Sequence, residues 1–141
     1  MADPRKKSNR LGIAPRVATY QIDGADIVYD ATQANGSAVA GRAVRESGNG
    51  VVRLTGAAET VLGKLLQVEP DGFCSVQTGG YMDLPKGDGT LTVGAKLVGD
   101  VRTAARGYVR GVAVATLAEV AVANGRAEDV SVADACECLF G

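Results

Sequence analysis

Residues 65–78 read LLQVEPDGFCSVQT, and this stretch decides the fold. Two apolar runs flank Pro70-Asp71-Gly72, a combination typical of a tight turn between antiparallel strands. In the second run Cys74 and Val76 alternate with polar residues, as side chains do on a strand with one buried face. The stretch therefore predicts a β-hairpin with Asp71 at its exposed tip.

The strand that leads into this turn is expected over residues 61–69. If side chains alternate along it without a break, Leu62, Leu66 and Val68 share the buried face. Lys64 interrupts the apolar side. The pattern therefore predicts a strand whose interior face is formed mainly by the three apolar residues.

Runs of extended character separated by glycine turns continue on both sides of the hairpin. Ser47-Gly48-Asn49-Gly50 is a strong turn signal, and residues 79–85 and 86–89 are expected to be loops. The expected strands are, in chain order, 17–22, 37–44, 51–55, 61–69, 73–78, 91–98, 107–115 and 135–140.

One short helix is expected after residue 115. Thr116-Leu117-Ala118-Glu119 matches a capping box, in which the Thr hydroxyl and the Glu carboxylate satisfy backbone donors at the start of a helix. Asn124-Gly125 supplies a stop. We expect Leu117, Val120 and Ala121 to form its apolar stripe.

Together these elements predict a mainly β protein: a small β-sandwich or barrel with one short helix near the C-terminus and an extended N-terminal arm. The predicted division is an arm over residues 1–35 and a β domain over residues 36–141. Fully extended at about 3.3 Å per residue, an arm of this length could reach on the order of 115 Å. It could therefore contact a neighbouring molecule well beyond its own domain.

The composition points toward assembly. Ala, Val and Gly dominate, aromatic residues are only 4% and Trp is absent. Burial of apolar surface contributes roughly 25 cal/mol per Å², so small side chains each contribute little. We expect such a thin core to gain stability from pairing with copies of itself or with a partner.

Charge is unevenly distributed along the chain. The net charge is −1, which argues against generic nucleic-acid binding. Residues 1–16 nevertheless carry a net +4, against −5 for the rest. Three interpretations of this basic arm stay open: a solvated tail, a segment ordered on an acidic protein neighbour, or a nucleic-acid contact, the last without aromatic residues to stack on bases.

The chain contains no histidine. This removes the commonest general base, any Ser-His-Asp or Cys-His arrangement and the usual zinc ligand set.

Gly79-Gly80 and Gly87-Asp88-Gly89 match neither common phosphate-binding pattern and are interpreted as turn glycines. Asp83, Asp88 and Asp100 lack a calcium-loop pattern and are interpreted as solvated surface. The sequence predicts no catalytic, metal or cofactor site, and no cofactor.

Three cysteines are present, Cys74, Cys136 and Cys138. On a strand the last two share a face with Phe140, and Cys74 lies beside Val76, so the simplest interpretation is buried small hydrophobic residues. A three-cysteine metal site or a regulatory disulfide are the alternatives.

The charged N-terminus and the lack of a run of about 20 apolar residues predict no signal peptide and no membrane segment. Assembly in a reducing cytoplasm is expected.

The stretch from about residue 58 to residue 114 resembles phage head-decoration, or capsid cement, proteins of the small β-domain type. The residues that carry the resemblance are LGKLLQVEPDGFCSVQTGGYMDLPKGDGTLTVGAKLVG followed by RGYVRGVAVAT, and they cover about two-fifths of the chain. This is a pattern of turns and small residues, with no catalytic signature. The first 35 residues fall outside it.

The resemblance implies a structural virion protein without a cofactor, assembled in the host cytoplasm. It would bind the outer face of a phage capsid, with the major capsid protein and itself, as a trimer, as partners. It would stabilise contacts between capsid subunits, without membrane or nucleic-acid binding. The implied contact residues are Arg5, Lys6, Lys7, Arg10 and Arg16 in the arm, Asp71 at the hairpin tip, and Tyr81, Met82 and Leu84 in the expected loop.

Two other classes of function compete with this interpretation. One is a small ligand- or carbohydrate-binding β module of a virion or cell-surface protein, for which four Tyr and two Phe offer few aromatic platforms. The other is an enzyme accessory domain similar to biotinyl or lipoyl carriers. Those carriers need a lysine at a hairpin tip, where this chain has Pro70-Asp71-Gly72.

Overall fold

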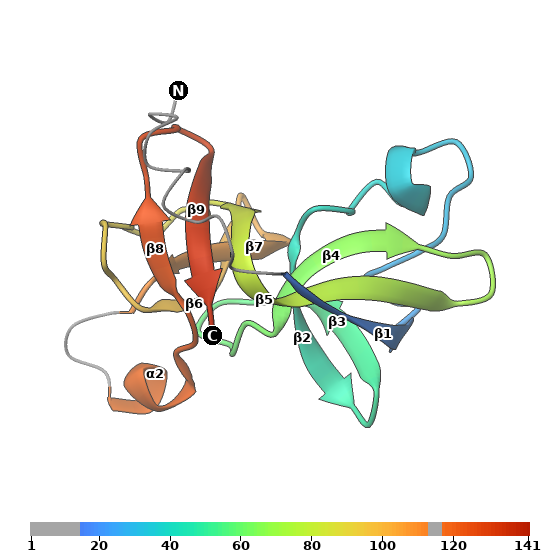
Figure 1. Cartoon of the computed structure of the whole chain (residues 1–141), viewed down its shortest axis with the longest axis horizontal. Helices are drawn as coiled ribbons and strands as arrows, with labels where there is room; N and C mark the ends of the chain where they lie inside the picture. Colours follow the sequence, from blue (N-terminus) through green and yellow to red (C-terminus); the bar gives the residue numbers. More distant parts are fainter. Residues whose placement is uncertain (1–14, 113–116) are drawn as a thin grey trace.

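The computed structural model describes residues 15–112 and 117–141, apart from the side chain of Leu117. As predicted, the described chain is mainly β, with one short α-helix near the C-terminus (Figure 1). The elements are β1 (Arg16–Ile22), the 3-10 turn η1 (Ala34–Gly36), β2 (Ala43–Gly48), β3 (Val51–Leu54), β4 (Gly63–Val68), β5 (Phe73–Pro85), β6 (Leu97–Arg102), β7 (Ala105–Gly111), α2 (Leu117–Val122), β8 (Arg126–Asp129) and β9 (Ala135–Phe140).

Five strands close into a barrel, one of the two predicted architectures. Their order is β1-β3-β2-β4-β5, and β5 pairs back with β1 to complete the ring. The β1–β3 pair is parallel, and the other four pairs are antiparallel. The barrel interior is filled by the buried side chains of Ile27, Val44, Val52, Leu54, Leu65, Val68, Cys74 and Val76.

The hairpin predicted from residues 65–78 is present as β4 and β5, but the predicted inner face of β4 is wrong. Leu65 is fully buried, whereas Leu66 is only partly buried. The reason is a bulge between Leu65 and Gln67, which shifts the register against β5. A bulge adds one residue to one strand, so alternation is broken there and Val68 still faces inward.

Strand β5 is longer than predicted, because residues 79–85 continue it instead of forming a loop. Its first part pairs with β1 and β4 in the barrel, and its second part, from Gly80 to Pro85, pairs with β9. Gly80 has φ = +87°, a backbone conformation that favours glycine. Gly79 and Gly80 therefore allow the strand to bend between its barrel partners, β1 and β4, and its second partner, β9.

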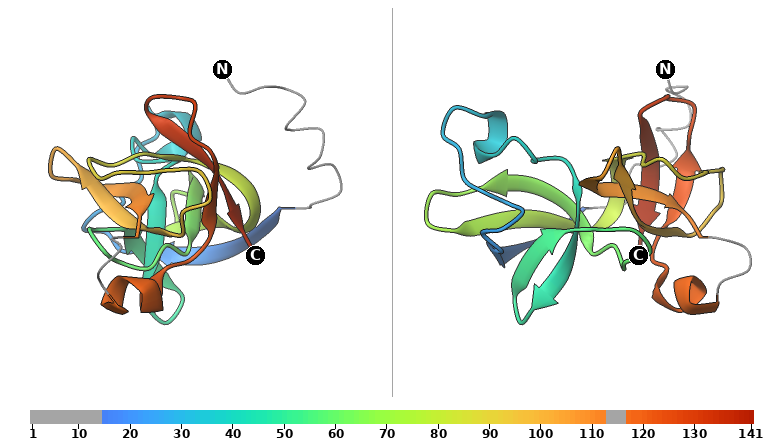
Figure 2. Two further views of the ribbon diagram at one scale, coloured as in Figure 1. Left: turned by 90° about the vertical axis from the view of Figure 1, so that its left-hand side faces the viewer. Right: turned by 180° about the vertical axis from the view of Figure 1, so that it is seen from behind.

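The second half of β5 starts a second lobe, formed by β6, β7, β8, β9 and α2 (Figures 1 and 2). Isolated bridges tie the β6–β7 hairpin to the β5–β9–β8 sheet at Lys96–Arg126 and at Lys86–Val109. The lobe surrounds its own core, whose largest member is the fully buried Phe140. Ala43 and Val61, from the barrel side of the chain, also belong to this core. The two lobes are therefore packed as one body.

The helix is present, but Val120 and Ala121 are wrong as members of its predicted apolar stripe, and the side chain of Leu117 lies outside what the structure describes. Val120 is 53% exposed and Ala121 is exposed, whereas Glu119 is buried. The cause is an ion pair: the Glu119 carboxylate lies 2.6 Å from Nη1 of Arg110 on β7. The predicted capping residue Thr116 lies outside the described residues. Strand β8 was not predicted at all.

The predicted boundary of the arm at residue 35 needs correction, because residues 16–35 belong to the barrel. Strand β1 pairs with both β3 and β5, and Ile27 is fully buried. Gly36 lies so close to the carbonyl of Val68 that a Cβ would overlap it. Residues 1–14 lie outside the described part of the chain. In that described part, no helix is long and apolar enough to cross a membrane.

Candidate functional site

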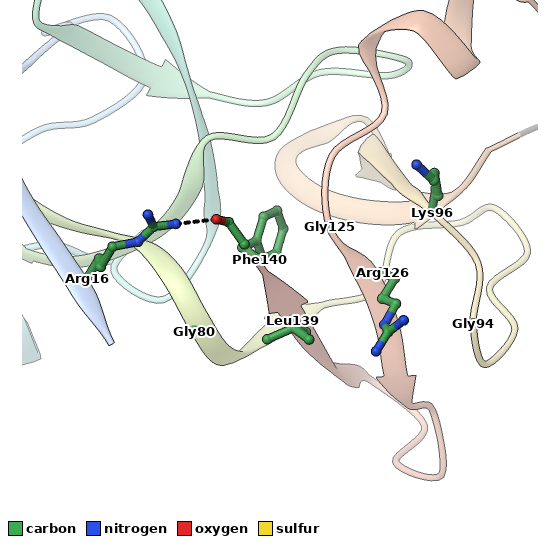
Figure 3. A pocket seen from close by; sticks show the side chains of 9 residues that line it. Arg16, Gly80, Gly94, Lys96, Gly125, Arg126, Leu139 and Phe140 are labelled. Carbon is green, nitrogen blue, oxygen red and sulfur yellow. Dashed lines mark hydrogen bonds between the residues drawn. The ribbon is translucent and has the colours of Figure 1, made fainter. Parts of the chain in front are cut away.

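A cleft of about 640 Å³ opens where the barrel meets the second lobe, and we call it the Arg16 cleft. It lies beside the first residue of β1, the bend of β5 and the ends of β8 and β9. Figure 3 shows Arg16 on one side and Lys96 and Arg126 on the other, with Leu139 and Phe140 between them. The lining residues are Arg16, Gly80, Gly94, Lys96, Gly125, Arg126, Leu139, Phe140 and Gly141.

Arg16 is held in this cleft by two features of the strands around it. Its Nη2 donates a hydrogen bond of 2.7 Å to the main-chain oxygen of Gly141, drawn as a dashed line in Figure 3. Its guanidinium also occupies the space that a Cβ on Gly79 would need. Because the chain enters β1 here, the basic segment 1–14 is joined to the body, through Pro15, beside the cleft.

Lys96 and Arg126 bring two more cationic side chains to the opposite side. They face one another across an antiparallel bridge, an arrangement of like charges that is unfavourable without a neutralising anion. Arg126 is offset by Glu128, at 2.7 Å, and its side chain is 58% exposed. Lys96 is exposed, and no carboxylate of the described residues lies within ion-pair distance of it.

The floor of the cleft is apolar. The Phe140 ring lies against Gly125, so closely that a Cβ there would be 2.7 Å from a ring carbon. Gly125 also has φ = +72°, which favours glycine. A cationic rim above an apolar floor suits an acidic side chain together with the aliphatic carbons that carry it.

Of the residues predicted to contact a partner, Arg16 and Asp71 are exposed and described. Asp71 lies at the tip of the β4–β5 hairpin, where it accepts a 3.2 Å hydrogen bond from the Phe73 amide, on the side away from the second lobe (Figure 1). The structure therefore separates Asp71 from the Arg16 cleft. The other predicted arm residues, Arg5, Lys6, Lys7 and Arg10, lie outside the described residues.

The predicted contact loop at Tyr81, Met82 and Leu84 is instead part of strand β5. Met82 and Leu84 are buried, so the prediction that they contact a partner at the surface is wrong. Met82 is 4% exposed and Leu84 is fully buried in the core of the second lobe. Tyr81 is partly buried. The error follows from treating Gly79-Gly80 as a turn.

Lys96 and Arg126 were missed, because nothing local in the sequence links residues 30 positions apart. Their proximity depends on β8, which the pattern did not reveal. The four residues of β8 are Arg-Ala-Glu-Asp, three of them charged, so the sequence itself offers no alternation that marks a strand.

The cysteines lie in the two cores, as the simplest interpretation predicted. Cys136 and Cys138 share a face with Phe140, their sulfurs 3.0 Å apart, and Cys74 lies beside Val76 in the barrel. A thiol hydrogen bond lowers the pKa of Cys136 and, together with burial, raises that of Cys138. Burial raises the pKa of Cys74 to about 11. All three are free thiols.

Asp100 is not the solvated carboxylate that was predicted. It is 6% exposed, accepts a 2.8 Å hydrogen bond from the Gly89 amide and lies 3.7 Å from Nε of Arg110. Asp88 is exposed and accepts a bond from the Thr103 amide. These carboxylates order the loops around β6. The described residues contain no cluster of three or more side chains suited to a metal ion.

No family model matches the chain, and no curated protein matches it significantly. The likeness to capsid cement proteins therefore depends on the sequence stretches quoted for it alone.

Proposed function

We propose that this protein is a structural virion protein that binds the outer surface of an assembled phage capsid and stabilises contacts between major capsid protein subunits. The observation that carries the proposal is the position of the Arg16 cleft. A segment with a net positive charge joins the body beside three further cationic residues, so charge of one sign is concentrated on one side.

The remainder of the body does not share this sign. Without Lys96 and Arg126, residues 17–141 carry eight basic and fifteen acidic residues, a net −7, so a complementary acidic protein surface would be attracted to one side of the molecule and repelled from much of the rest. Such charge asymmetry orients a partner and speeds its encounter more than it adds affinity. This suits a protein that must bind in one orientation.

Affinity would come from repetition. A capsid presents many identical sites, so copies linked as a trimer would engage several at once, and modest contacts per copy would add to stable decoration. The small apolar side chains of the core are consistent with a body that gains stability from its neighbours.

The proposal is tested with the full chain and purified expanded capsid shells in a sucrose-gradient co-sedimentation assay. Removing three charges of the cleft in the variant Arg16→Gln/Lys96→Gln/Arg126→Gln should reduce occupancy at least tenfold at physiological salt, and deleting residues 1–14 should reduce it further. Both losses should shrink as ionic strength rises, because screening weakens the attraction of the unaltered protein.

Asp71→Asn provides the matched control, since it changes an exposed charge at the hairpin tip, away from the cleft. We expect it to leave occupancy within twofold. A loss with Asp71→Asn and none with the triple variant would move the contact to the hairpin. Unaltered protein that does not sediment with shells at any salt concentration would overturn the proposal.

A ligand-binding module is the second candidate, because a cleft of about 640 Å³ is within the size range of small-molecule sites, roughly 300–1,000 Å³. Among the described residues, the only aromatic one that lines the cleft is Phe140, which is 1% exposed. A sugar would therefore find no exposed ring to stack on. Thermal shift with a panel of neutral and acidic sugars separates the two functions.

A further inference from the structure

A second cleft, of about 320 Å³, lies at the junction of the two lobes, and we call it the Tyr108 cleft. Its basic residues come from three different places: Arg42 from the segment before β2, Lys64 from β4 and Arg102 from the end of β6. Tyr108 of β7 lies among them, and Asp83 of β5 is the one carboxylate in the lining. The fold thus gathers three cations around one aromatic ring.

The two arginines are stacked on this ring. The guanidinium carbon of Arg42 lies 5.3 Å from the ring centroid of Tyr108, and that of Arg102 lies 4.7 Å from it. These distances keep the two charges within roughly one screening length of each other, about 8–10 Å at physiological ionic strength. Cation–π attraction offsets part of their mutual repulsion.

Both arginines are also anchored by main-chain carbonyls. Nη1 of Arg42 donates to the carbonyl of Arg106 at 3.2 Å. Nη2 of Arg102 donates to the carbonyl of Asp134 at 3.1 Å and to that of Lys86. Each guanidinium therefore keeps its other terminal nitrogen without an acceptor among the described residues. These donors are held in place and need little ordering to bind a ligand.

The lack of carboxylate partners sets this pair apart from other arginines of the body. Arg45, Arg53, Arg106 and Arg110 each lie within 4.0 Å of a carboxylate oxygen of Asp26, Glu59, Asp100 or Glu119. Within the described ranges, Arg42, Lys64 and Arg102 have no such partner, and even Asp83 is beyond ion-pair distance of them. The cleft therefore holds three cationic side chains whose charge no carboxylate of the described residues neutralises.

We infer that the Tyr108 cleft binds carboxylate groups of an acidic protein segment. Nε and Nη2 of Arg42 present two parallel N–H groups that match a carboxylate, and Nη1 of Arg102 and the ammonium of Lys64 add further donors. Residues 15–141 carry eleven basic and fifteen acidic residues, so the body as a whole repels a polyanion such as nucleic acid. A short acidic peptide segment feels mainly the local charge of the cleft. The inference holds for any protein partner, capsid or not.

The inference is tested by NMR titration of the full ¹⁵N-labelled chain with hexaglutamate, with hexaglutamine as the matched neutral peptide. Hexaglutamate should shift the Tyr108 amide and the Arg42 and Arg102 side-chain Nε–H signals, and hexaglutamine should not. Arg42→Gln/Arg102→Gln should weaken the shifts near Tyr108 at least tenfold. Lys96→Gln/Arg126→Gln, which removes the same charge from the Arg16 cleft, should leave them unchanged.

Each remaining outcome counts for or against the inference. Equal loss of the Tyr108 shifts in both double variants would show nonspecific attraction and overturn it, as would shifts of equal size with hexaglutamine. Stronger shifts with an eight-nucleotide single-stranded DNA would assign the cleft to nucleic acid instead. If the glutamine variant does not fold, Arg42→Lys/Arg102→Lys keeps the charge but removes the planar donors, and unchanged hexaglutamate affinity in it would contradict the inference.

Discussion

Several glycines in this protein leave space that other groups fill, and the consequence of adding a methyl group depends on what fills it. A Cβ on Gly63 would overlap the main-chain carbonyl of Gln77 on the neighbouring strand. The three atoms nearest to a Cβ on Gly79 all belong to the guanidinium of Arg16, at the end of a flexible side chain. The first group cannot move without disturbing the barrel, and the second can.

We therefore expect Gly63→Ala to lower the free energy of unfolding by about 1–3 kcal/mol or more, as overpacking does. Gly79 is also buried, but Gly79→Ala should lower it by less than about 1 kcal/mol, because the exposed Arg16 side chain is free to move aside. Urea unfolding followed by circular dichroism measures both. Equal destabilisation by the two variants would show that the Arg16 side chain is fixed as firmly as the backbone.

Cys74 gives the protein a pH-dependent stability at alkaline pH. Its pKa is raised from 9.0 to about 11 by burial, so the folded state keeps the thiol neutral where the unfolded state ionises. The resulting stability is complete below pH 9 and is lost as pH rises through 11. We expect the unfolding free energy to fall more steeply between these values in the unaltered protein than in Cys74→Val. Identical slopes would contradict this.

At the scale of elements, the bulge in β4 decides which of two neighbouring leucines supports the barrel. Leu65 is fully buried and belongs to the barrel core, whereas Leu66 is only partly buried. Leu65→Ala should cost about 2–5 kcal/mol, the range for a buried leucine. Leu66→Ala should cost about 1 kcal/mol. The reverse order in denaturant unfolding would contradict the register described for β4.

The sequence predicted those elements that have local signals. The β4–β5 hairpin has its Pro-Asp-Gly turn, and β9 has the alternation of Cys136, Cys138 and Phe140. The bulge in β4 and the bend at Gly80 have no local signal. For the bend, the reason is that the same pair of glycines is compatible with a turn and with a bent strand. Whether it bends or turns depends on β9, about 60 residues later, as the partner of the second half of β5.

The candidate site was only partly predictable for a related reason. Arg16 could be found because it belongs to a run of basic residues close together in sequence. Lys96 and Arg126 meet it only through tertiary packing, and so do Arg42 and Arg102 around Tyr108. Charge clusters built from separate elements have no signature in a single sequence.

For the molecule as a whole, the two lobes are bound too closely to unfold separately. They share β5, and the core of the second lobe includes Ala43 and Val61 from the barrel side. Glu59, in the loop before β4, also lies 3.1 Å from Nη2 of Arg106 on β7. Scanning calorimetry should therefore show one transition whose calorimetric and van't Hoff enthalpies agree. Two resolved transitions would show that the lobes are independent.

We propose that this molecule functions as a part of a capsid, attached by a cationic side to an acidic protein surface. The most direct measurement is its distribution among particles from cells that produce the phage, separated by density and quantified by immunoblot. We predict that the protein sediments with DNA-filled, expanded heads and is absent from unexpanded precursors. Protein found only at the top of the gradient, free of particles, would contradict the account.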